Sequence, residues 1–281
     1  MSNIIVPTDF SKGSEHALKY ALKLASIYNA KIKLLWIEKP ETLSIYGDND
    51  NYNIKIEARK ALNEQIEAIN IIYPNIEIHS KIKKGKIYRE VSNYALAEKA
   101  SMIVVGSHGS SGYEDFWIGS NAFRIVNSAQ CPVIIIRQGF EIPEKGISKI
   151  IFPIDHTTDT LKKLSFVIQF AKIFNAEIDV LALYSTTIKS LKVKVDNSLK
   201  DATKLIQKES IKATYNILQS ENILIDILKY IEKSDANLIS IMTEHNQTEL
   251  NSMLGQLPQQ IINQCQIPIL SINSNDSNIL I

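Results

Sequence analysis

Short apolar runs alternate with longer amphipathic stretches along this chain. In the first 140 residues, five runs rich in β-branched and other apolar residues predict strands. The segments between them have helical spacing or composition, which predicts a parallel sheet with helices on both faces. The five predicted strands are Asn3–Pro7, Lys31–Ile37, Glu77–Ile82, Met102–Val105 and Val133–Arg137.

Two segments carry clear helical spacing. Apolar residues recur between Leu18 and Tyr28 after Ser11, a predicted N-cap, and a second amphipathic pattern covers Ile56–Ile72. Residues 38–53, before the second helix, are polar and contain the run Gly-Asp-Asn-Asp-Asn at 47–51. This composition predicts a loop, which is either a lid over a site or a plain insertion.

The pattern of the first half is repeated in the second. Residues 4–9 (Ile-Ile-Val-Pro-Thr-Asp) align with residues 150–155 (Ile-Ile-Phe-Pro-Ile-Asp) at a shift of 146, which falls to 136 near the ends of the halves. About ten residues are therefore missing from the middle of the second copy, and we expect the deletion in a loop. The second set of predicted strands is Lys149–Ile154, Glu177–Tyr184, a weak one at Tyr215–Leu218, Leu238–Met242 and Ile267–Ile272.

The repeat defines the fold class and the domains. We predict an α/β protein with two tandem Rossmann-like domains, each a five-stranded parallel sheet with helices on both faces. The domains are residues 1–140 and 147–281, joined by a short polar linker over 138–148.

Composition narrows the functional classes. The 281 residues are 45% hydrophobic and 22% charged, with a net charge of +1, which is typical of a globular protein and gives no basic surface for nucleic acid. A strand pattern begins at Asn3, and no apolar run has the length of a membrane span. We therefore expect a cytoplasmic protein without nucleic-acid or membrane partners.

The candidate chemistry lies in a glycine-rich segment after the fourth predicted strand. Gly106 and Gly109 flank a tight turn, and Gly119 and Ser120 follow after nine intervening residues, where a helix is predicted to begin. Glycines allow backbone amides to approach an anion, and the first N–H groups of a helix favour phosphate. The carboxyl ends of parallel strands are also where ligands bind in open α/β sheets, so the segment predicts a nucleotide site.

These residues resemble those of the universal stress protein family, whose ATP-binding members carry G-x2-G-x9-G-[ST] after the fourth strand. Residues 4–11 (Ile-Ile-Val-Pro-Thr-Asp-Phe-Ser) look like the opening strand and acidic turn of the family, and Cys131-Pro132-Val133 resembles the start of its fifth strand. The resemblance covers both halves and implies a stress-response or regulatory protein that binds ATP.

The resemblance implies a role for each matching residue. Pro7, Thr8 and Asp9 would lie near the adenosine, and Ile37 would line the adenine pocket. The other residues implied to hold the ribose and phosphates are Gly106, His108, Gly109, Gly119, Ser120 and Asn121. A divalent cation such as Mg²⁺ would bridge phosphate oxygens, and we predict no metal ligand from the protein.

Two of these residues have plainer alternatives. Asp9 could serve only to cap the helix that follows the first strand. His108 could be a turn residue with its ring in solvent.

The second copy lacks most of the motif. Met242, His245 and Gln256 stand where the first copy has Gly106, Gly109 and Ser120, and only Gly255 is retained. Side chains at these positions would obstruct a phosphate, so we predict one nucleotide per chain, bound in the first domain only.

The resemblance also suggests what the second copy does. Family members are described as dimerising through their last strands, so the two halves would form an internal pseudo-dimer, with further homo-oligomers left open. Pairing the apolar runs at 133–136 and 267–270 would also close two sheet edges.

Three functions are compatible with these sequence features. The leading one is an ATP-binding regulatory or stress-response protein. A slow ATP hydrolase is the alternative enzyme, but no Walker lysine, no Ser/His/Asp set and no convincing general base is present, so we assign no catalytic residue. The third is a protein-interaction scaffold without nucleotide turnover.

Overall fold

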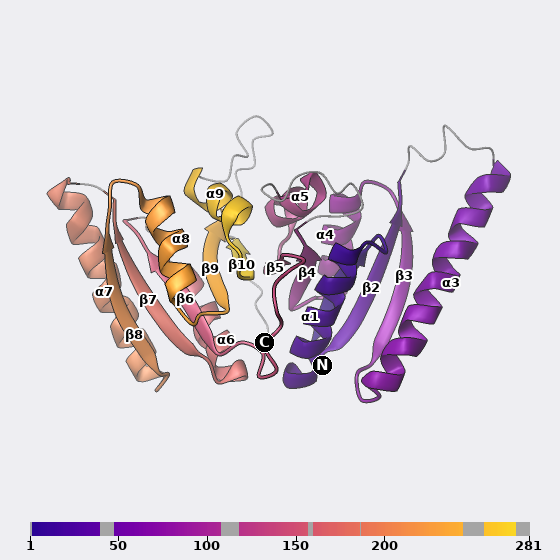
Figure 1. Ribbon diagram of the computed structural model, residues 1–281, viewed down its shortest axis with the longest axis horizontal. Helices are drawn as coiled ribbons and strands as arrows, with labels where there is room; N and C mark the ends of the chain where they lie inside the picture. The colour runs from indigo at the N-terminus through magenta and orange to yellow at the C-terminus, as the bar shows by residue number, and fades with distance from the viewer. Residues whose placement is uncertain are drawn as a thin grey trace. The chain divides into compact units, whose positions relative to one another are not determined.

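The protein is described from a computed structural model, over residues 2–39, 48–107, 118–156, 160–185, 187–243 and 256–273 (Figure 1). The chain divides into two compact units, Met1–Gly139 and Phe140–Ile279. Each unit is an α/β domain built around parallel strands, which confirms the predicted fold class.

The first domain has the strand order β3-β2-β1-β4-β5, with every neighbouring pair parallel. Right-handed crossovers place α1 and α3 on one face of these strands and α4 and α5 on the other. Its elements are β1 (Asn3–Thr8), α1 (Lys12–Tyr28), β2 (Lys31–Glu38), α3 (Asp48–Ile72), β3 (Ile78–Lys84), α4 (Ile87–Ala97), β4 (Met102–Gly106), α5 (Ser120–Ser128) and β5 (Val133–Ile136).

The second domain repeats this plan with the order β8-β7-β6-β9-β10. Its elements are β6 (Lys149–Ile154), α6 (Thr160–Phe174), β7 (Glu177–Tyr184), α7 (Lys189–Lys208), β8 (Ala213–Gln219), α8 (Ile223–Lys233), β9 (Leu238–Thr243), α9 (Gln256–Gln264) and β10 (Ile269–Asn273).

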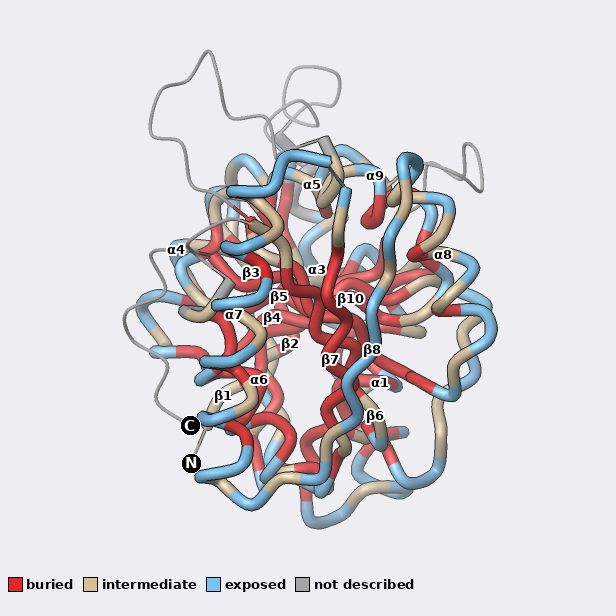
Figure 2. Tube along the Cα trace, turned by 90° about the vertical axis from the view of Figure 1, so that its left-hand side faces the viewer, coloured by how far each residue is buried: buried red, intermediate tan, exposed pale blue. Residues whose placement is uncertain are grey.

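The core of each domain lies between its central strands and the helices on both faces, where the tube in Figure 2 is coloured as buried. In β1, Ile4, Ile5 and Val6 are fully buried, as expected for a strand covered on both sides. In α1 the buried side includes Leu18 and Leu24, from the predicted helical pattern. Because the strand ends are fixed by this packing, the loops that follow β1, β2 and β4 start from defined positions.

The ten predicted strands agree with the observed ones to within two residues at each end. The predicted loop at 38–53 was wrong in part, because α3 begins at Asp48 rather than near Ile56. Asp and Asn are common at the start of a helix, so a run of them does not exclude one. Residues 40–47, and with them the choice between lid and insertion, lie outside the described residues.

The deletion in the second copy is not confined to a loop. Helix α7 has 20 residues where the equivalent α3 has 25, so part of the missing length comes from the helix. Both helices still begin after the second strand of their domain and end before the third.

Candidate functional site

The candidate site lies where the strand order of the first domain reverses. β1 lies between β2 and β4, and the chain leaves β1 toward β2 on one side and β4 toward β5 on the other. At such a switch point, the two outgoing loops separate and leave a crevice at the carboxyl ends of the strands.

A cavity of about 280 Å³ occupies this position. Eight of the ten residues predicted for the site line it, and they come from β1, β2, β4 and the start of α5: Pro7, Thr8, Asp9, Ile37, Gly106, Gly119, Ser120 and Asn121. The other two, His108 and Gly109, lie outside the described residues. The structure therefore brings together residues from four separate segments, of which the glycine segment was predicted from the sequence and the others from the family resemblance.

Asp9 organises the turn between β1 and α1. Its Oδ1 accepts hydrogen bonds from the backbone N–H and the hydroxyl of Ser11, at 3.2 and 2.5 Å. Ser11 in turn is the N-cap of α1, as predicted, and its Oγ accepts from the N–H of Ser14 at 3.3 Å. Asp9 is thus not itself the cap residue; it holds the cap and still lines the cavity.

Gly106 has a packing role that the sequence did not reveal. A Cβ at this position would lie 2.6 Å from the carbonyl oxygen of Gly13 in α1, closer than any real contact. The residue therefore has to be glycine so that α1 can approach β4, which is also how one glycine acts in dinucleotide-binding folds. This requirement exists whether or not an anion binds nearby.

The amino end of α5 supplies donors to the cavity. Gly119 is its N-cap and has no side chain to satisfy the first N–H groups, and its own N–H donates to the carbonyl of Ser107 at 2.7 Å. Residues 120–122, which carry the first N–H groups of the helix, all line the cavity. Free N–H groups and the helix dipole favour an anion at this end.

Sequence reasoning missed several residues of the cavity, and Glu38 is the most consequential. Its side chain is 2% exposed and lines the cavity at the end of β2. The Nζ of Lys55, in α3, lies 3.2 Å from its Oε2. The only signal in the sequence was a charged residue ending an apolar strand. The other missed residues include Ser14, Trp36, Lys39, Ile54 and Ile87.

The corresponding end of the second domain is built differently. Met242 lies in β9 where β4 has Gly106, and Asp155 follows β6 as Asp9 follows β1. Lys163 of α6 is buried, with its Nζ 5.0 Å from the centre of the Phe152 ring. Burial lowers the pKa of Lys163 to about 8, and the charge of Asp155 opposes that shift. His245 and Gly255 lie outside the described residues, and Gln256 is the first residue of α9.

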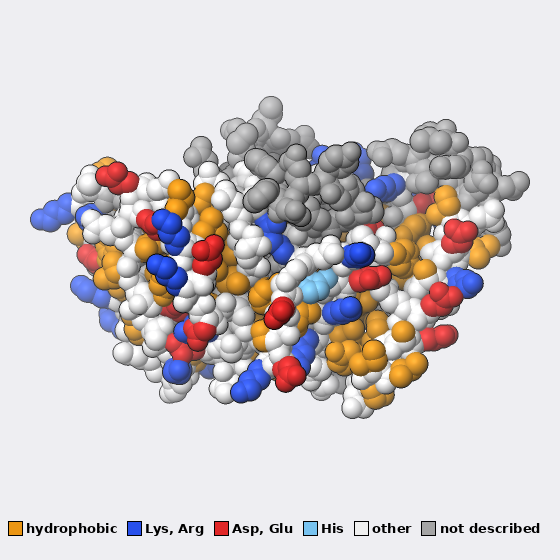
Figure 3. Space-filling model, in the orientation of Figure 1, with side chains coloured by type: hydrophobic (Ala, Val, Ile, Leu, Met, Phe, Trp, Pro, Cys, Tyr) orange, Lys and Arg blue, Asp and Glu red, His pale blue; other side chains and the backbone are white. Residues whose placement is uncertain are grey.

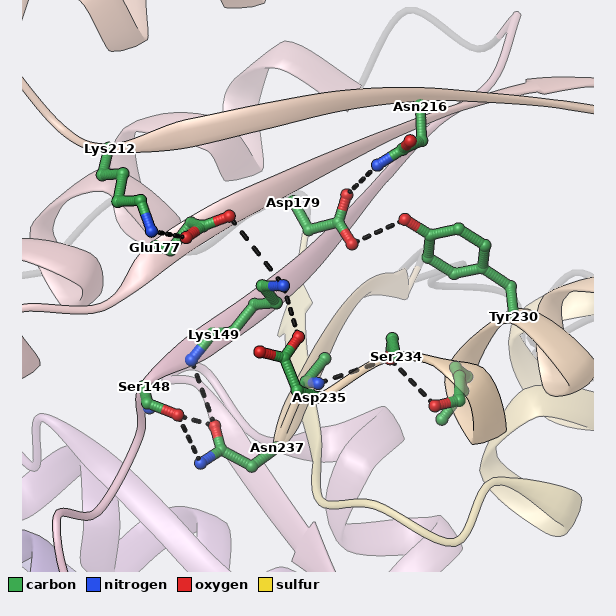
Figure 4. Close-up of polar contacts among 12 residues, drawn as sticks. Ser148, Lys149, Glu177, Asp179, Lys212, Asn216, Tyr230, Ser234, Asp235 and Asn237 are labelled. Atoms are coloured by element: carbon green, nitrogen blue, oxygen red, sulfur yellow. Dashed lines mark hydrogen bonds and ion pairs between the residues drawn. The ribbon is translucent and has the colours of Figure 1, made fainter.

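A larger cavity, of about 530 Å³, lies at the amino ends of the strands in the second domain. The buried carboxylate of Asp179 accepts hydrogen bonds from the side-chain amide of Asn216 at 2.9 Å and the hydroxyl of Tyr230 at 2.6 Å (Figure 4). Burial and the bond to Asp179 raise the pKa of Tyr230, which keeps it a donor. Acceptor and donors are thus matched inside the domain.

Ion pairs complete this network. Lys149 contacts Asp235 and lies 3.9 Å from Glu177, whose other oxygen is 2.5 Å from Lys212 (Figure 4). Hydrogen bonding to Asp235 raises the pKa of Lys149, and the bond from Lys212 lowers the pKa of Glu177. Because Lys149 and Lys212 pair with Glu177 and Asp235, and Asp179 is held by two neutral donors, we regard this cluster as structural, and we place the functional site at the smaller cavity of the first domain.

The residues that the structure describes contain no helix long and apolar enough to cross a membrane. They also contain no group of three His, Cys, Asp or Glu side chains positioned to hold a metal ion. On the face shown in Figure 3, basic and acidic side chains are interspersed, as the net charge of +1 leads one to expect.

Known proteins resemble both the first half and the whole chain. Residues 1–137 match the model of the universal stress protein family. A universal stress protein of Methanocaldococcus jannaschii is 26% identical over 140 residues, covering 48% of this chain and 81% of that protein. The universal stress protein YxiE of Bacillus subtilis is 27% identical over 148 residues, covering 48% of this chain and 99% of that protein.

The likeness of fold extends over both domains. The crystal structure of a universal stress protein from Archaeoglobus fulgidus aligns with 97% of this chain and 98% of its own, with a TM-score of 0.78 and 18% identity. At this identity the comparison establishes the fold alone.

Proposed function

We propose that the protein is an ATP-binding regulatory or stress-response protein that holds one nucleotide in its first domain, where residues 1–137 match the model of the universal stress protein family. The observation that carries the proposal is the convergence of eight predicted residues, from four segments, on one cavity at the switch point of the sheet.

The two ends of the cavity suit different parts of ATP. The apolar side chain of Ile37 and the turn at Pro7 to Asp9 lie on the side of β1 and β2, where the nucleoside would bind. Gly119 and Ser120 lie at the amino end of α5, where free N–H groups favour phosphates. His108 and Gly109 would complete the phosphate side.

A divalent cation fits this scheme through the ligand. Backbone N–H groups at the start of α5 cannot ligate a cation, but they can hold the phosphates of ATP, whose oxygens are the ligands that Mg²⁺ prefers. We therefore propose that Mg²⁺, when bound, is held mainly by phosphate oxygens, while residues 119–121 orient the phosphate chain.

The second domain is proposed to bind no nucleotide. Met242 brings a side chain to the strand end where Gly106 stands in the first domain, and the buried Lys163 occupies the helix that follows β6. Its proposed role is that of an internal partner. β5 (Val-Ile-Ile-Ile) and β10 (Ile-Leu-Ser-Ile-Asn) are apolar last strands, and pairing them would protect both from other chains. Sedimentation analysis is expected to show that a single chain is folded without a second one, and further association of whole chains stays open.

Identification of the bound nucleotide tests the function. Purified protein is denatured, and the released small molecules are identified by mass spectrometry; the protein stripped of ligand is then titrated with ATP in a calorimeter. We expect ATP to be released or to bind on titration. Release of ADP alone, with ATP consumed on incubation, would favour the slow hydrolase. If no nucleotide is released and the titration gives no heat of binding, the proposal would be wrong and the protein-interaction scaffold would be the remaining function.

A further inference from the structure

The carboxylate of Glu38 is buried at the edge of the cavity and, among the residues that the structure describes, accepts no hydrogen bond. Its side chain is 2% exposed, and within the described part of the chain neither Oε1 nor Oε2 accepts a hydrogen bond. Lys55 provides charge at 3.2 Å from Oε2, but its side chain is 48% exposed. A buried acceptor without a donor costs free energy, and a ligand that brings a donor recovers it.

The backbone fixes where this carboxylate lies. Glu38 is the last residue of β2, and its carbonyl accepts the N–H of Gly85 at 3.0 Å, just beyond β3. The position is therefore held by the sheet and does not depend on the residues beyond 39.

The sheet order places Glu38 at the base end of the site. β1 separates β2 from β4, and neighbouring strands lie about 4.8 Å apart, so Glu38 is roughly 10 Å across the sheet from the strand of Gly106. If the phosphates of a nucleotide lie at the start of α5, as proposed, a base joined to them through one ribose would span this distance and would meet the end of β2.

We propose that Glu38 is a specificity-determining residue that accepts a hydrogen bond from the 6-amino group of adenine and so selects adenine over 6-oxopurine nucleotides. This inference rests on the proposed nucleotide-binding function. Adenine carries an amino donor at C6, whereas guanine and hypoxanthine carry a carbonyl oxygen there. In a buried site, the C6 oxygen of a 6-oxopurine facing the carboxylate of Glu38 would bring two hydrogen-bond acceptors together with no donor between them.

The test compares ATP with ITP, which carries an oxygen in place of the amino group at C6 and a hydrogen on the neighbouring N1. Calorimetric titration of the stripped wild-type protein is expected to give an affinity for ATP about 10–100-fold higher than for ITP, the range expected for one hydrogen bond to a charged acceptor. This measurement needs no variant. Equal affinities for the two nucleotides would overturn the role of Glu38 and leave the proposed function intact, whereas no binding of either would overturn the function itself.

Substitutions assign the effect to the side chain. Glu38→Gln keeps the size but removes the charge, and we expect its ATP affinity to fall about tenfold and its preference over ITP to shrink to within about threefold. Glu64→Gln is the matched control, since Glu64 also pairs with a lysine of α3 (Lys60, 3.8 Å) but is exposed. It should keep the wild-type preference. Thermal melts establish that both variants fold, and a Glu38→Gln variant that loses stability but keeps the preference would show a structural role only.

Two other nucleotides test different contacts for the same carboxylate. GTP presents N1–H and an amino group at C2, so tighter binding of GTP than of ATP would mean that Glu38 reads the other edge of a guanine base and would contradict the inference. A preference of ATP over 2′-deoxyATP that disappears in Glu38→Gln would place the ribose at Glu38 and would contradict it as well.

Discussion

At the scale of single residues, the glycine at the end of β4 serves two purposes that the sequence could not separate. It lines the cavity, and it lets the backbone of Gly13 in α1 approach β4. The second purpose acts on stability, and so it can be measured without any ligand.

Gly106→Ala is expected to destabilise the protein by about 1–3 kcal/mol, because the new Cβ would lie 2.6 Å from the carbonyl oxygen of Gly13 and both elements are backbone that must shift. Urea unfolding followed by circular dichroism measures the change. The control is Gly139→Ala, where a Cβ meets nothing within 4 Å and we expect a change within about 0.5 kcal/mol. Equal effects at the two positions would show that the close approach of α1 does not matter.

Lys163 allows a prediction about pH. Its pKa is lowered from the ordinary 10.5 to about 8 by burial, so between these values the unfolded chain binds more protons than the folded one. Stability should therefore rise with pH in this window, and the cost of burying the charge should be fully present below about pH 8.

Replacing this lysine by an apolar residue should remove that cost. Lys163→Met is expected to be about 1–3 kcal/mol more stable than the wild type at pH 7, with the difference narrowing as the pH approaches 10.5. Urea unfolding at pH 7, 9 and 10 measures it. Lys204→Met, at an exposed position of α7, is the control and should show no such pH dependence. A variant less stable than the wild type at pH 7 would mean that the ammonium stabilises the fold.

At the scale of elements, the amino end of α5 is where backbone geometry and proposed ligand chemistry coincide. Gly119 itself supplies no side-chain partner to the first N–H groups of the helix. A residue that supplies such a partner would improve the helix and occupy the proposed phosphate site at the same time.

Gly119→Asp separates the effect on helix stability from the effect on phosphate binding. Asp is a favourable N-cap, so the variant should be at least as stable as the wild type, but its carboxylate would repel phosphate, and we expect ATP affinity to fall by about a hundredfold or more. Calorimetry and thermal melts give the two quantities. Asn222→Asp places the same carboxylate at the N-cap of α8 in the second domain and should leave ATP binding unchanged. Undiminished binding by Gly119→Asp would move the phosphates away from α5.

Some helices and strands could be predicted from the sequence, and others could not. Strands such as β1 and β4 were predictable because burial on both faces requires a run of apolar residues. The start of α3 was not, since Asp and Asn suit both a loop and a first helical turn. The glycine motif predicted the residues at one end of the cavity, whereas Glu38 needed the structure, because only tertiary packing shows that this charged residue is buried.

At the scale of the whole molecule, duplication has produced two domains with the same topology and different strand ends. The strand orders β3-β2-β1-β4-β5 and β8-β7-β6-β9-β10 are equivalent, so the scaffold that creates a switch point is present twice. The difference lies in a few side chains at that point, such as Met242 for Gly106 and Lys163 for Ala17. Fold alone therefore does not determine how many ligands the chain binds.

The number of nucleotides per chain measures this asymmetry. We expect a calorimetric stoichiometry of one ATP per chain, because Met242 adds a side chain where the first domain has Gly106, and the ammonium of Lys163 is buried over the Phe152 ring of β6. Gly119→Asp, which alters only the first domain, should then leave no site of wild-type affinity. A stoichiometry of two, or a site of wild-type affinity that remains in Gly119→Asp, would show that the second domain binds nucleotide by contacts other than the glycine motif. Since the two domains share their topology, that result would mean that nucleotide binding depends on the strand ends that both domains possess and not on the glycines.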